Sequence, residues 1–249
     1  MAALRVATIN IRNLADRWDE RLPLLLADMA ALQPDLLGIQ ECVFPMQQDR
    51  LLGAAGEGRY IAHRAWAGRP EYGNALLVRE PLAATAVERL DLGLNRSALR
   101  AVVRLEDGPP LLVAVTHLHH LTADESVRDD QVRALVEWLA AAPHADAHVV
   151  VGDFNAEPDE PAARRMVDAG FRSAYAIANG ADPDVTWPSG LEAPAPDTEG
   201  PPGCLDYVWV RGGARVTTAR LAFDRPAVGD PTLYPSDHVG IAAELEIGG

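Results

Sequence analysis

Polar side chains that could bind a metal ion or move protons stand at the ends of apolar segments along this chain. The clearest case follows the β-branched run 149–151, where Gly152 leads to Asp153 and Asn155. Positions i and i+2 of an extended chain point to the same side, so this carboxylate and this amide leave the strand end together. Similar positions are held by Asn10, Glu41, His117, Asp206, Asp237 and His238. Each alone fits a turn, a cap or a solvated charge, but the set indicates a functional site.

The residue types indicate a metal ion bound by oxygen atoms. Glu41, Asp153 and Asp237 supply carboxylates. Asn10 adds an amide oxygen, and the two cysteines of the chain form no thiolate cluster. Such hard ligands suit Mg²⁺ or Mn²⁺ rather than Zn²⁺.

A histidine beside an aspartate is the usual pair for general-base chemistry, because the carboxylate fixes the tautomer and the orientation of the ring. Asp206 lies inside an apolar predicted strand, where a carboxylate needs a partner. Asp237 and His238 would face opposite sides of a regular strand. Both can serve one site only at an irregular strand start, which the Pro235-Ser236 pair provides.

Hydrophobic periodicity predicts the elements that must position these side chains. Besides the short run 149–151, strands are predicted over residues 4–11, 35–40, 60–66, 74–79, 83–90, 99–105, 111–116, 205–210, 216–223 and 239–247. Helices are predicted over residues 19–33, 46–55, 127–141 and 161–169. The stretch 178–203 is rich in proline, glycine and acidic residues and is expected to be a functional or disordered loop.

The order of these elements predicts a layered α/β architecture. Two strands joined by a helix favour a right-handed crossover, so Asn10 and Glu41 should emerge at the same edge of one sheet. Strands and helices alternate at both ends of the chain and strands dominate its middle, which predicts two packed sheets with helices outside. We interpret residues 1–249 as one domain, because no linker separates two cores.

Charge and composition limit the partners and the location. The net charge of −14 slows approach to a polyanion, so a small phosphoester is favoured as substrate, with nucleic acid as a possible one. No apolar run is long enough to span a bilayer, and the N-terminus leads directly into a strand without a secretory signal. With Cys42 and Cys204 interpreted as reduced thiols, the expected location is cytoplasmic.

Six short motifs resemble the endonuclease/exonuclease/phosphatase superfamily, which includes pancreatic deoxyribonuclease, apurinic endonucleases, bacterial sphingomyelinases and inositol polyphosphate phosphatases. The motifs are Thr8-Ile9-Asn10-Ile11, Gln40-Glu41, Thr116-His117-Leu118, Gly152-Asp153-Phe154-Asn155, Leu205-Asp206-Tyr207 and Ser236-Asp237-His238. They occur in the order of the family and span nearly the whole chain. Any one motif is weak evidence, but six in order are strong evidence.

The resemblance implies a four-layer α/β/β/α sandwich, in which two mixed sheets pack face to face with helices outside and the site lies at one open edge. It also implies metal-dependent hydrolysis of a phosphoester by in-line attack of water, with Mg²⁺ or Mn²⁺ as the cofactor. By the same resemblance, Glu41 would be the main metal carboxylate, assisted by Asn10 and Asp237.

The other motif residues would act on water, phosphate and protons. By resemblance, Asp153 would position or activate the attacking water, and Asn155 would hold a phosphate oxygen. His238, oriented by Asp206, would act on the phosphate or as an acid/base partner. His117 would be the second histidine, a general acid or a donor to the phosphate. The sequence leaves open how the two histidines divide these roles.

Substrate contacts are predicted at further positions. Arg96 and Arg100 are candidate phosphate contacts, and Asn74 is a candidate substrate contact. Trp187 could stack a base or cover an apolar group, or it could simply anchor its loop. Cys204 stands where many relatives have a basic residue, so one cation of the family site is missing here.

The favoured function is divalent-metal-dependent hydrolysis of a phosphodiester, with a small or lipid-like substrate. The preference for a diester rests on His117, which fits the diesterase-like branches of the family. The alternatives are a metal-dependent nuclease acting on DNA or RNA and a phosphomonoesterase. A non-catalytic binding domain is disfavoured because every key position is filled. A two-carboxylate glycosidase would leave the histidines and Asn155 without a role.

Overall fold

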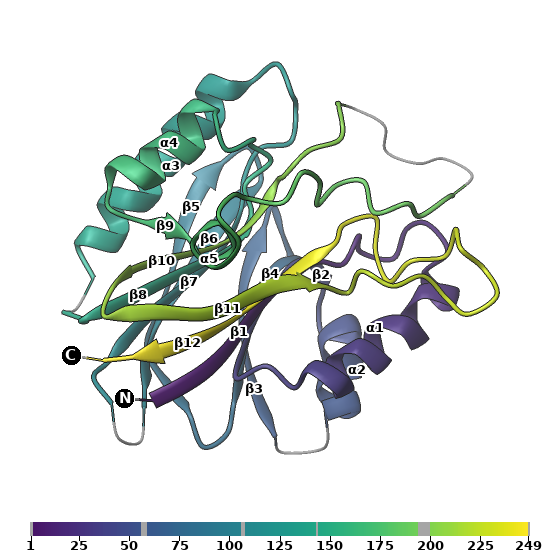
Figure 1. The fold of residues 1–249 in the computed structure, drawn as a ribbon, viewed down its shortest axis with the longest axis horizontal. Helices are drawn as coiled ribbons and strands as arrows, with labels where there is room; N and C mark the ends of the chain where they lie inside the picture. Colours follow the sequence, from purple (N-terminus) through teal and green to yellow (C-terminus); the bar gives the residue numbers. More distant parts are fainter. Residues whose placement is uncertain (1, 56–58, 106–107, 143, 194–199, 249) are drawn as a thin grey trace.

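The computed structural model describes residues 2–55, 59–105, 108–142, 144–193 and 200–248 (Figure 1). Its strands are β1 (Ala2–Asn10), β2 (Leu36–Val43), β3 (Tyr60–Ala67), β4 (Arg69–Arg79), β5 (Ala83–Gly93), β6 (Arg96–Arg104), β7 (Leu111–His117), β8 (Ala147–Asp153), β9 (Arg172–Ser173), β10 (Asp206–Gly212), β11 (Ala214–Ala222) and β12 (Gly240–Ile247). They form two six-stranded sheets. The first sheet has the order β11-β12-β1-β2-β4-β3, and the second has the order β5-β6-β7-β8-β10-β9.

Five helices connect these strands in the described residues. They are α1 (Trp18–Leu32), α2 (Met46–Ala55), α3 (Glu125–Ala140), α4 (Pro161–Asp168) and α5 (Ala174–Asn179). None of the helices in the part of the chain that the structure describes is both long enough and apolar enough to cross a membrane.

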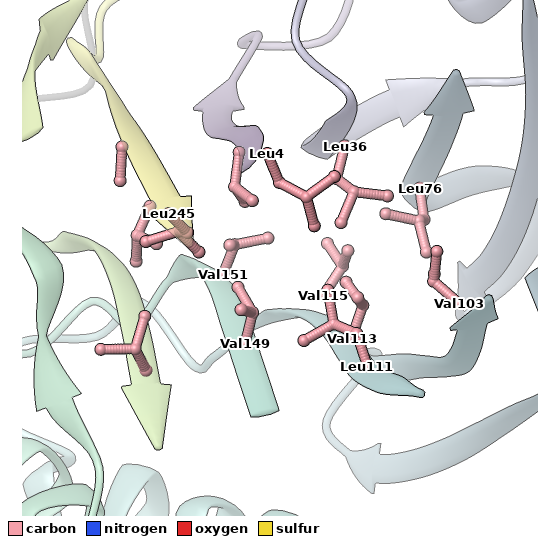
Figure 2. Packing of buried hydrophobic residues seen from close by; sticks show 14 of the residues in the cluster. Leu4, Leu36, Leu76, Val103, Leu111, Val113, Val115, Val149, Val151 and Leu245 are labelled. Atoms are coloured by element: carbon pink, nitrogen blue, oxygen red, sulfur yellow. The ribbon is translucent and has the colours of Figure 1, made fainter. Parts of the chain in front are cut away.

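The two sheets pack face to face through a hydrophobic cluster (Figure 2). The cluster joins Leu4 and Leu36 of the first sheet to Val113 and Val151 of the second, all at most 5 % exposed. The sheets approach each other closely at Gly38 on β2, where a Cβ would lie 2.3 Å from Cγ2 of Val151. The space between the sheets is therefore filled by aliphatic side chains.

Helices cover the outer faces of both sheets (Figure 1). On the first sheet, Leu25 and Met29 of α1 share a buried cluster with Ile39 of β2. On the second sheet, Leu135 of α3 and Met166 of α4 belong to a separate buried cluster. These two outer clusters and the central one build the four-layer α/β/β/α sandwich, so the predicted fold class is confirmed.

Most predicted elements are present, with ends that differ from the prediction. The predicted helix 46–55 coincides with α2. β9 and α5 are not predicted by the sequence, because a two-residue strand and a six-residue helix are too short to show a period. Ser173 Oγ accepts a hydrogen bond of 3.3 Å from the backbone N–H of Ala176 and caps α5. The predicted loop 178–203 thus begins after α5, and its residues 194–199 lie outside the described residues.

His148 on β8 makes the fold sensitive to acid. Its ring packs edge-on against Phe171, and its buried Nδ1 has no hydrogen-bond partner within the described residues. Burial, followed by the charges of Arg211 and His144, lowers the pKa of His148 from 6.5 to about 4. Between these pH values the unfolded chain binds a proton that the folded chain excludes, so stability falls as the pH falls from 6.5 to about 4.

The substitution His148→Gln is therefore expected to weaken the pH dependence of stability. Urea unfolding measured across the range from pH 6.5 to about 4 should show a smaller loss of unfolding free energy in the variant than in the wild type. Parallel curves for the two proteins would contradict this role of His148.

Candidate active site

Strand register brings three of the predicted site residues together at one edge of the second sheet. β7 and β8 run parallel, with His117 paired with Asp153. β10 runs antiparallel to β8, with Asp206 paired with Asp153. The three residues therefore stand on three neighbouring strand ends, and all are at most 4 % exposed.

The first sheet adds further residues at the same edge. β1 and β2 run parallel with Asn10 paired with Gln40, so Asn10 and Glu41 emerge together, as predicted. Asn10 Nδ2 lies 3.4 Å from Oε1 of Glu41. β12 runs antiparallel to β1, so the chain enters β12 beside the end of β1. This entry places Asp237 and His238 at the same edge.

Three residues near the ends of β2 and β8 have unusual backbone conformations. Gly152 has φ +148°, and a Cβ at this position would lie 2.0 Å from the backbone oxygen of Thr116, so only glycine fits between β8 and β7. Glu41 and Asn155 have φ +55° and +47°. The register between β2 and β4 is also irregular around Glu41. A left-handed conformation is costly for a residue such as Glu41, and such strain concentrates at functional sites.

The carboxylate of Asp153 lies at the centre of the site. Its Oδ2 is 3.0 Å from Nδ2 of Asn10, 3.5 Å from Nε2 of His117 and 3.7 Å from Nε2 of His238. Its Oδ1 accepts a hydrogen bond of 2.9 Å from the backbone N–H of Asn155. Burial raises the pKa of Asp153 above its usual value, against the opposing effects of His238 and these hydrogen bonds. Nitrogen atoms from both sheets thus converge on one carboxylate oxygen.

His238 is held by a carboxylate on its other nitrogen. Its Nδ1 lies 2.9 Å from Oδ2 of Asp206, which is fully buried. Burial alone would lower the pKa of His238, but the carboxylates of Asp206 and Asp153 outweigh this effect and raise the pKa to about 10. The ring of His238 is therefore a cation at neutral pH. The backbone N–H of His238 is also anchored, 3.3 Å from Oγ of Ser236, in the irregular segment before β12.

His117 has the opposite surroundings. Its Nδ1 lies 3.4 Å from Nη1 of Arg96, a guanidinium instead of a carboxylate. Burial, followed by the charges of Arg96, His238 and His120, lowers the pKa of His117 well below its usual value of 6.5. His117 is therefore neutral at neutral pH. The two histidines face the same carboxylate in different charge states.

A cavity opens above these side chains. It is lined by Asn10, Arg12, Glu41, Tyr72, Arg96, His117, His120, Thr122, Arg128, Asp153, Asn155, Glu157, Glu160, Trp187, Gly200, Pro201, Leu205, Asp237 and His238. Asp206 lies behind His238, away from the cavity surface. Trp187 forms part of the wall, with its ring centroid 6.5 Å from that of His238.

Two predicted substrate contacts do not reach this cavity. Arg100 lies on the helix-facing side of β6, where its guanidinium stacks 4.2 Å over the ring of Trp138 and its Nε donates to Glu88 over 3.1 Å. Asn74 is buried and donates to the backbone oxygen of Ser97 over 2.8 Å, which ties β4 to β6. The structure therefore places both residues between layers and outside the cavity lining, away from the position that the predicted substrate contacts require.

Two other residues that line the cavity were not found from the sequence. Nε of Arg12 lies 2.8 Å from Asp16 and 3.5 Å from Asp237, each measured to Oδ2. Arg12 stands two positions after Asn10, but its φ of 53° places it beyond the regular strand. There the alternation of side chains between two faces no longer predicts which way a side chain points. Burial and the nearby Glu41 raise the pKa of Tyr72. Its position one residue before a glycine gave no signal of this role.

The oxygen donors on one wall of the cavity fit a divalent metal ion. Glu41, Asn10 and Asp237, the predicted ligands, all line the cavity. The second oxygen of Glu41, Oε2, accepts a hydrogen bond of 2.7 Å from Nδ2 of Asn13, which orients the carboxylate. Carboxylate and amide oxygens are the ligands that Mg²⁺ and Mn²⁺ prefer.

A second group could also hold a metal ion. One ligand atom from each of Asp153, Asp206 and His238 lies within 4.8 Å of the others. Nδ1 of His238 is already bonded to Asp206, and the raised pKa of His238 keeps the ring protonated. A metal-bound histidine must be deprotonated. His238 in this protonation state is therefore not a metal ligand, and the assignment of the ion to Glu41, Asn10 and Asp237 stays a prediction.

Comparison with known proteins identifies a family and several relatives of this chain. A model of the Endonuclease/Exonuclease/phosphatase family matches residues 7–238. Nocturnin of Mus musculus is 28 % identical over 258 residues, which cover 92 % of this chain and 58 % of nocturnin. The uncharacterized protein YbhP of Escherichia coli K12 is 25 % identical over 264 residues, which cover 98 % of this chain and 97 % of YbhP.

A solved structure supports the fold independently. The human nocturnin catalytic domain with a bound sulfate anion has a TM-score of 0.78 and 25 % identity, covering 98 % of this chain and 94 % of that domain. The chain spans about three fifths of the length of the mouse nocturnin that it matches, as the 58 % coverage shows. The family match runs from residue 7, one position before the first of the six motifs, to residue 238, the last residue of the sixth motif.

Proposed function

Because the chain belongs to the Endonuclease/Exonuclease/phosphatase family, whose members are metal-dependent phosphoester hydrolases, we propose that it hydrolyses a phosphodiester by in-line attack of water. We propose further that residues 1–249 act as one catalytic domain. The observation that supports this most strongly is the convergence of Asn10, His117 and His238 on Oδ2 of Asp153, within 3.0 to 3.7 Å.

In this proposal, the water oxygen forms a bond to phosphorus while the bond from phosphorus to the leaving oxygen breaks. Asp153 accepts the proton of the water, and its raised pKa suits a base that works near neutral pH. His238 carries a proton on a ring that Asp206 orients, and it gives this proton to the leaving oxygen. Asn155 holds a phosphate oxygen beside Asp153.

A Mg²⁺ or Mn²⁺ ion held by Glu41, Asn10 and Asp237 would supply positive charge to the phosphoryl oxygens. Within the chain itself, Arg12 and Arg96 add positive charge at the cavity. These arginines place positive charge beside the carboxylates of the cavity, in a protein of net charge −14.

A small or lipid-like diester is the proposed substrate class. The cavity lining includes Glu157 and also Glu160, which is paired with Arg128 over 2.7 Å. Together with the net charge of −14, the acidic Glu157 disfavours a long polyanion. Trp187 and Pro201 give one wall an apolar surface that suits an aromatic or aliphatic group next to the phosphate. The sulfate held by the human nocturnin domain resembles phosphate in shape and charge and supports an anionic ligand.

A cytoplasmic location is part of the same proposal. It rests on the two cysteines, Cys42 and Cys204, which are both buried and free.

Purified protein with Mg²⁺ or Mn²⁺ is expected to hydrolyse bis(para-nitrophenyl) phosphate faster than para-nitrophenyl phosphate, and excess EDTA is expected to abolish both rates. The physical reason is that the oxygen ligand set needs a divalent ion to neutralise the phosphate charge. Release of nitrophenol measures the rates, and adding back the ion after EDTA treatment is the control.

Plasmid and single-stranded DNA and RNA at the same ion concentration separate the alternatives. Faster cleavage of nucleic acid than of small diesters would support the nuclease instead, and a preference for the monoester would support a phosphomonoesterase. If no substrate of this panel is hydrolysed with any divalent ion, the proposed function is wrong.

A further inference from the structure

Arg96 lies on the far side of His117 from the centre of the site. It begins β6, which runs antiparallel to β7, so its side chain reaches the end of β7. Nη1 of Arg96 lies 3.4 Å from Nδ1 of His117, and Nη2 lies 3.1 Å from Nδ1 of His120. His117 thus lies between Asp153 and Arg96, and Arg96 in turn contacts His120.

The chemistry of arginine decides how these contacts are made. A guanidinium has only donors and stays protonated in proteins. Nδ1 of His117 must therefore accept from Arg96. In a neutral imidazole one nitrogen is a donor and the other an acceptor, so the proton of His117 must sit on Nε2. Nε2 is the nitrogen that lies 3.5 Å from Oδ2 of Asp153, where a donor meets an acceptor.

We propose that Arg96 is a positioning residue that holds neutral His117 in the Nε2–H form, so that His117 offers the phosphate a hydrogen bond and does not act as a base. The role toward phosphate rests on the proposed function, whereas the tautomer itself does not. Burial and the nearby positive charges lower the pKa of His117, which agrees with a neutral ring.

This tautomer assigns the roles that the sequence left open between the two histidines. Nδ1 of His238 faces the carboxylate of Asp206 and carries a proton, while Nδ1 of His117 faces a guanidinium and carries none. Proton transfer in the reaction then passes from water to Asp153 and from His238 to the leaving oxygen. His117 keeps its proton throughout and stabilises charge that develops on the phosphate.

Nitrogen NMR of the histidine rings in the full chain tests the tautomer without substrate. In the wild type, Nδ1 of His117 is expected at a pyridine-type shift and Nε2 at a pyrrole-type shift, with the signals assigned by their loss in His117→Gln. Pyrrole-type Nδ1 in the wild type would overturn the proposal. Because the resting protein is observed, this outcome is independent of whether a diester is hydrolysed.

Two substitutions of Arg96 test whether this residue sets the tautomer of His117. Arg96→Glu puts an acceptor at Nδ1 and is expected to move the proton of His117 to that nitrogen, whereas Arg96→Lys keeps a donor and the wild-type pattern. The rate constant kcat should fall at least ~10²-fold in Arg96→Glu, as for loss of a preorganised donor, and much less in Arg96→Lys. The matched control is Arg104→Glu at the other end of β6, outside the cavity.

The ring of His238 serves as the internal reference, because its bond to Asp206 should keep Nδ1 pyrrole-type in every variant if the site stays folded. If His117 keeps a pyridine-type Nδ1 in Arg96→Glu while His238 is unchanged, Arg96 does not set the tautomer and the proposal is wrong.

Discussion

Replacing His238 with alanine is expected to lower kcat for diester hydrolysis by at least ~10²-fold, as loss of a positioned acid/base group does. The ring is anchored through Nδ1 to Asp206 at 2.9 Å, and its Nε2 faces Asp153 at 3.7 Å, so it brings a proton and a positive charge to the reacting atoms. Nitrophenol release at saturating substrate and ion measures the change.

The control for this variant is His144→Ala, because the side chain of His144 is 88 % exposed and does not line the cavity. Asp206→Asn is informative as well. It removes the carboxylate that raises the pKa of His238, so the ring should lose its proton at lower pH. The decline of kcat at high pH should therefore begin at a lower pH than in the wild type. A wild-type kcat in His238→Ala would contradict the role given to this residue.

Glu41→Gln is expected to produce the second large effect, a loss of at least ~10²-fold in kcat together with weaker apparent affinity for Mg²⁺. The amide keeps the shape of the side chain and its contact with Asn13, but it removes the negative charge that a divalent ion requires. Rates measured against Mg²⁺ concentration, and calorimetric titration with Mn²⁺, separate ion binding from chemistry.

The matched control is Glu71→Gln, an acidic residue of β4 in the same sheet whose side chain is 55 % exposed and does not line the cavity. If Glu41→Gln keeps the wild-type ion dependence while Asp206→Asn strongly loses affinity for the ion, the metal ion instead binds at the cluster of Asp153, Asp206 and His238. The two variants therefore decide between the two possible ligand sets.

The two arginines of β6 show where prediction from sequence stops. Arg96 and Arg100 are both candidate phosphate contacts in the sequence, and alternation places them on the same face of one strand. That face packs on the helix layer, where Ala98 and Val102 are buried in the outer cluster and Arg100 stacks on Trp138. Arg96 reaches the cavity because it begins the strand at the open edge.

The sequence by itself determined most of the elements and the residue types of the site. Short-range patterns encode strands, helices and the breaks between them, so these patterns alone place Asn10, Glu41 and His117 at strand ends. Six such motifs in order led to the family and to the four-layer fold. The hard oxygen ligands also followed from residue type, and their role in binding a metal ion stays a prediction.

Only the tertiary structure decided what each group does, because those roles depend on neighbours that are distant in the chain. Asp206 and His238 are separated by 32 positions, and Arg96 and His117 by 21. The pairing of β6 with β7 brings the guanidinium of Arg96 to His117. The packing of one sheet against the other brings the carboxylate of Asp206 to His238. No local pattern states which pairing occurs, and this pairing makes His238 a cation and leaves His117 a neutral donor.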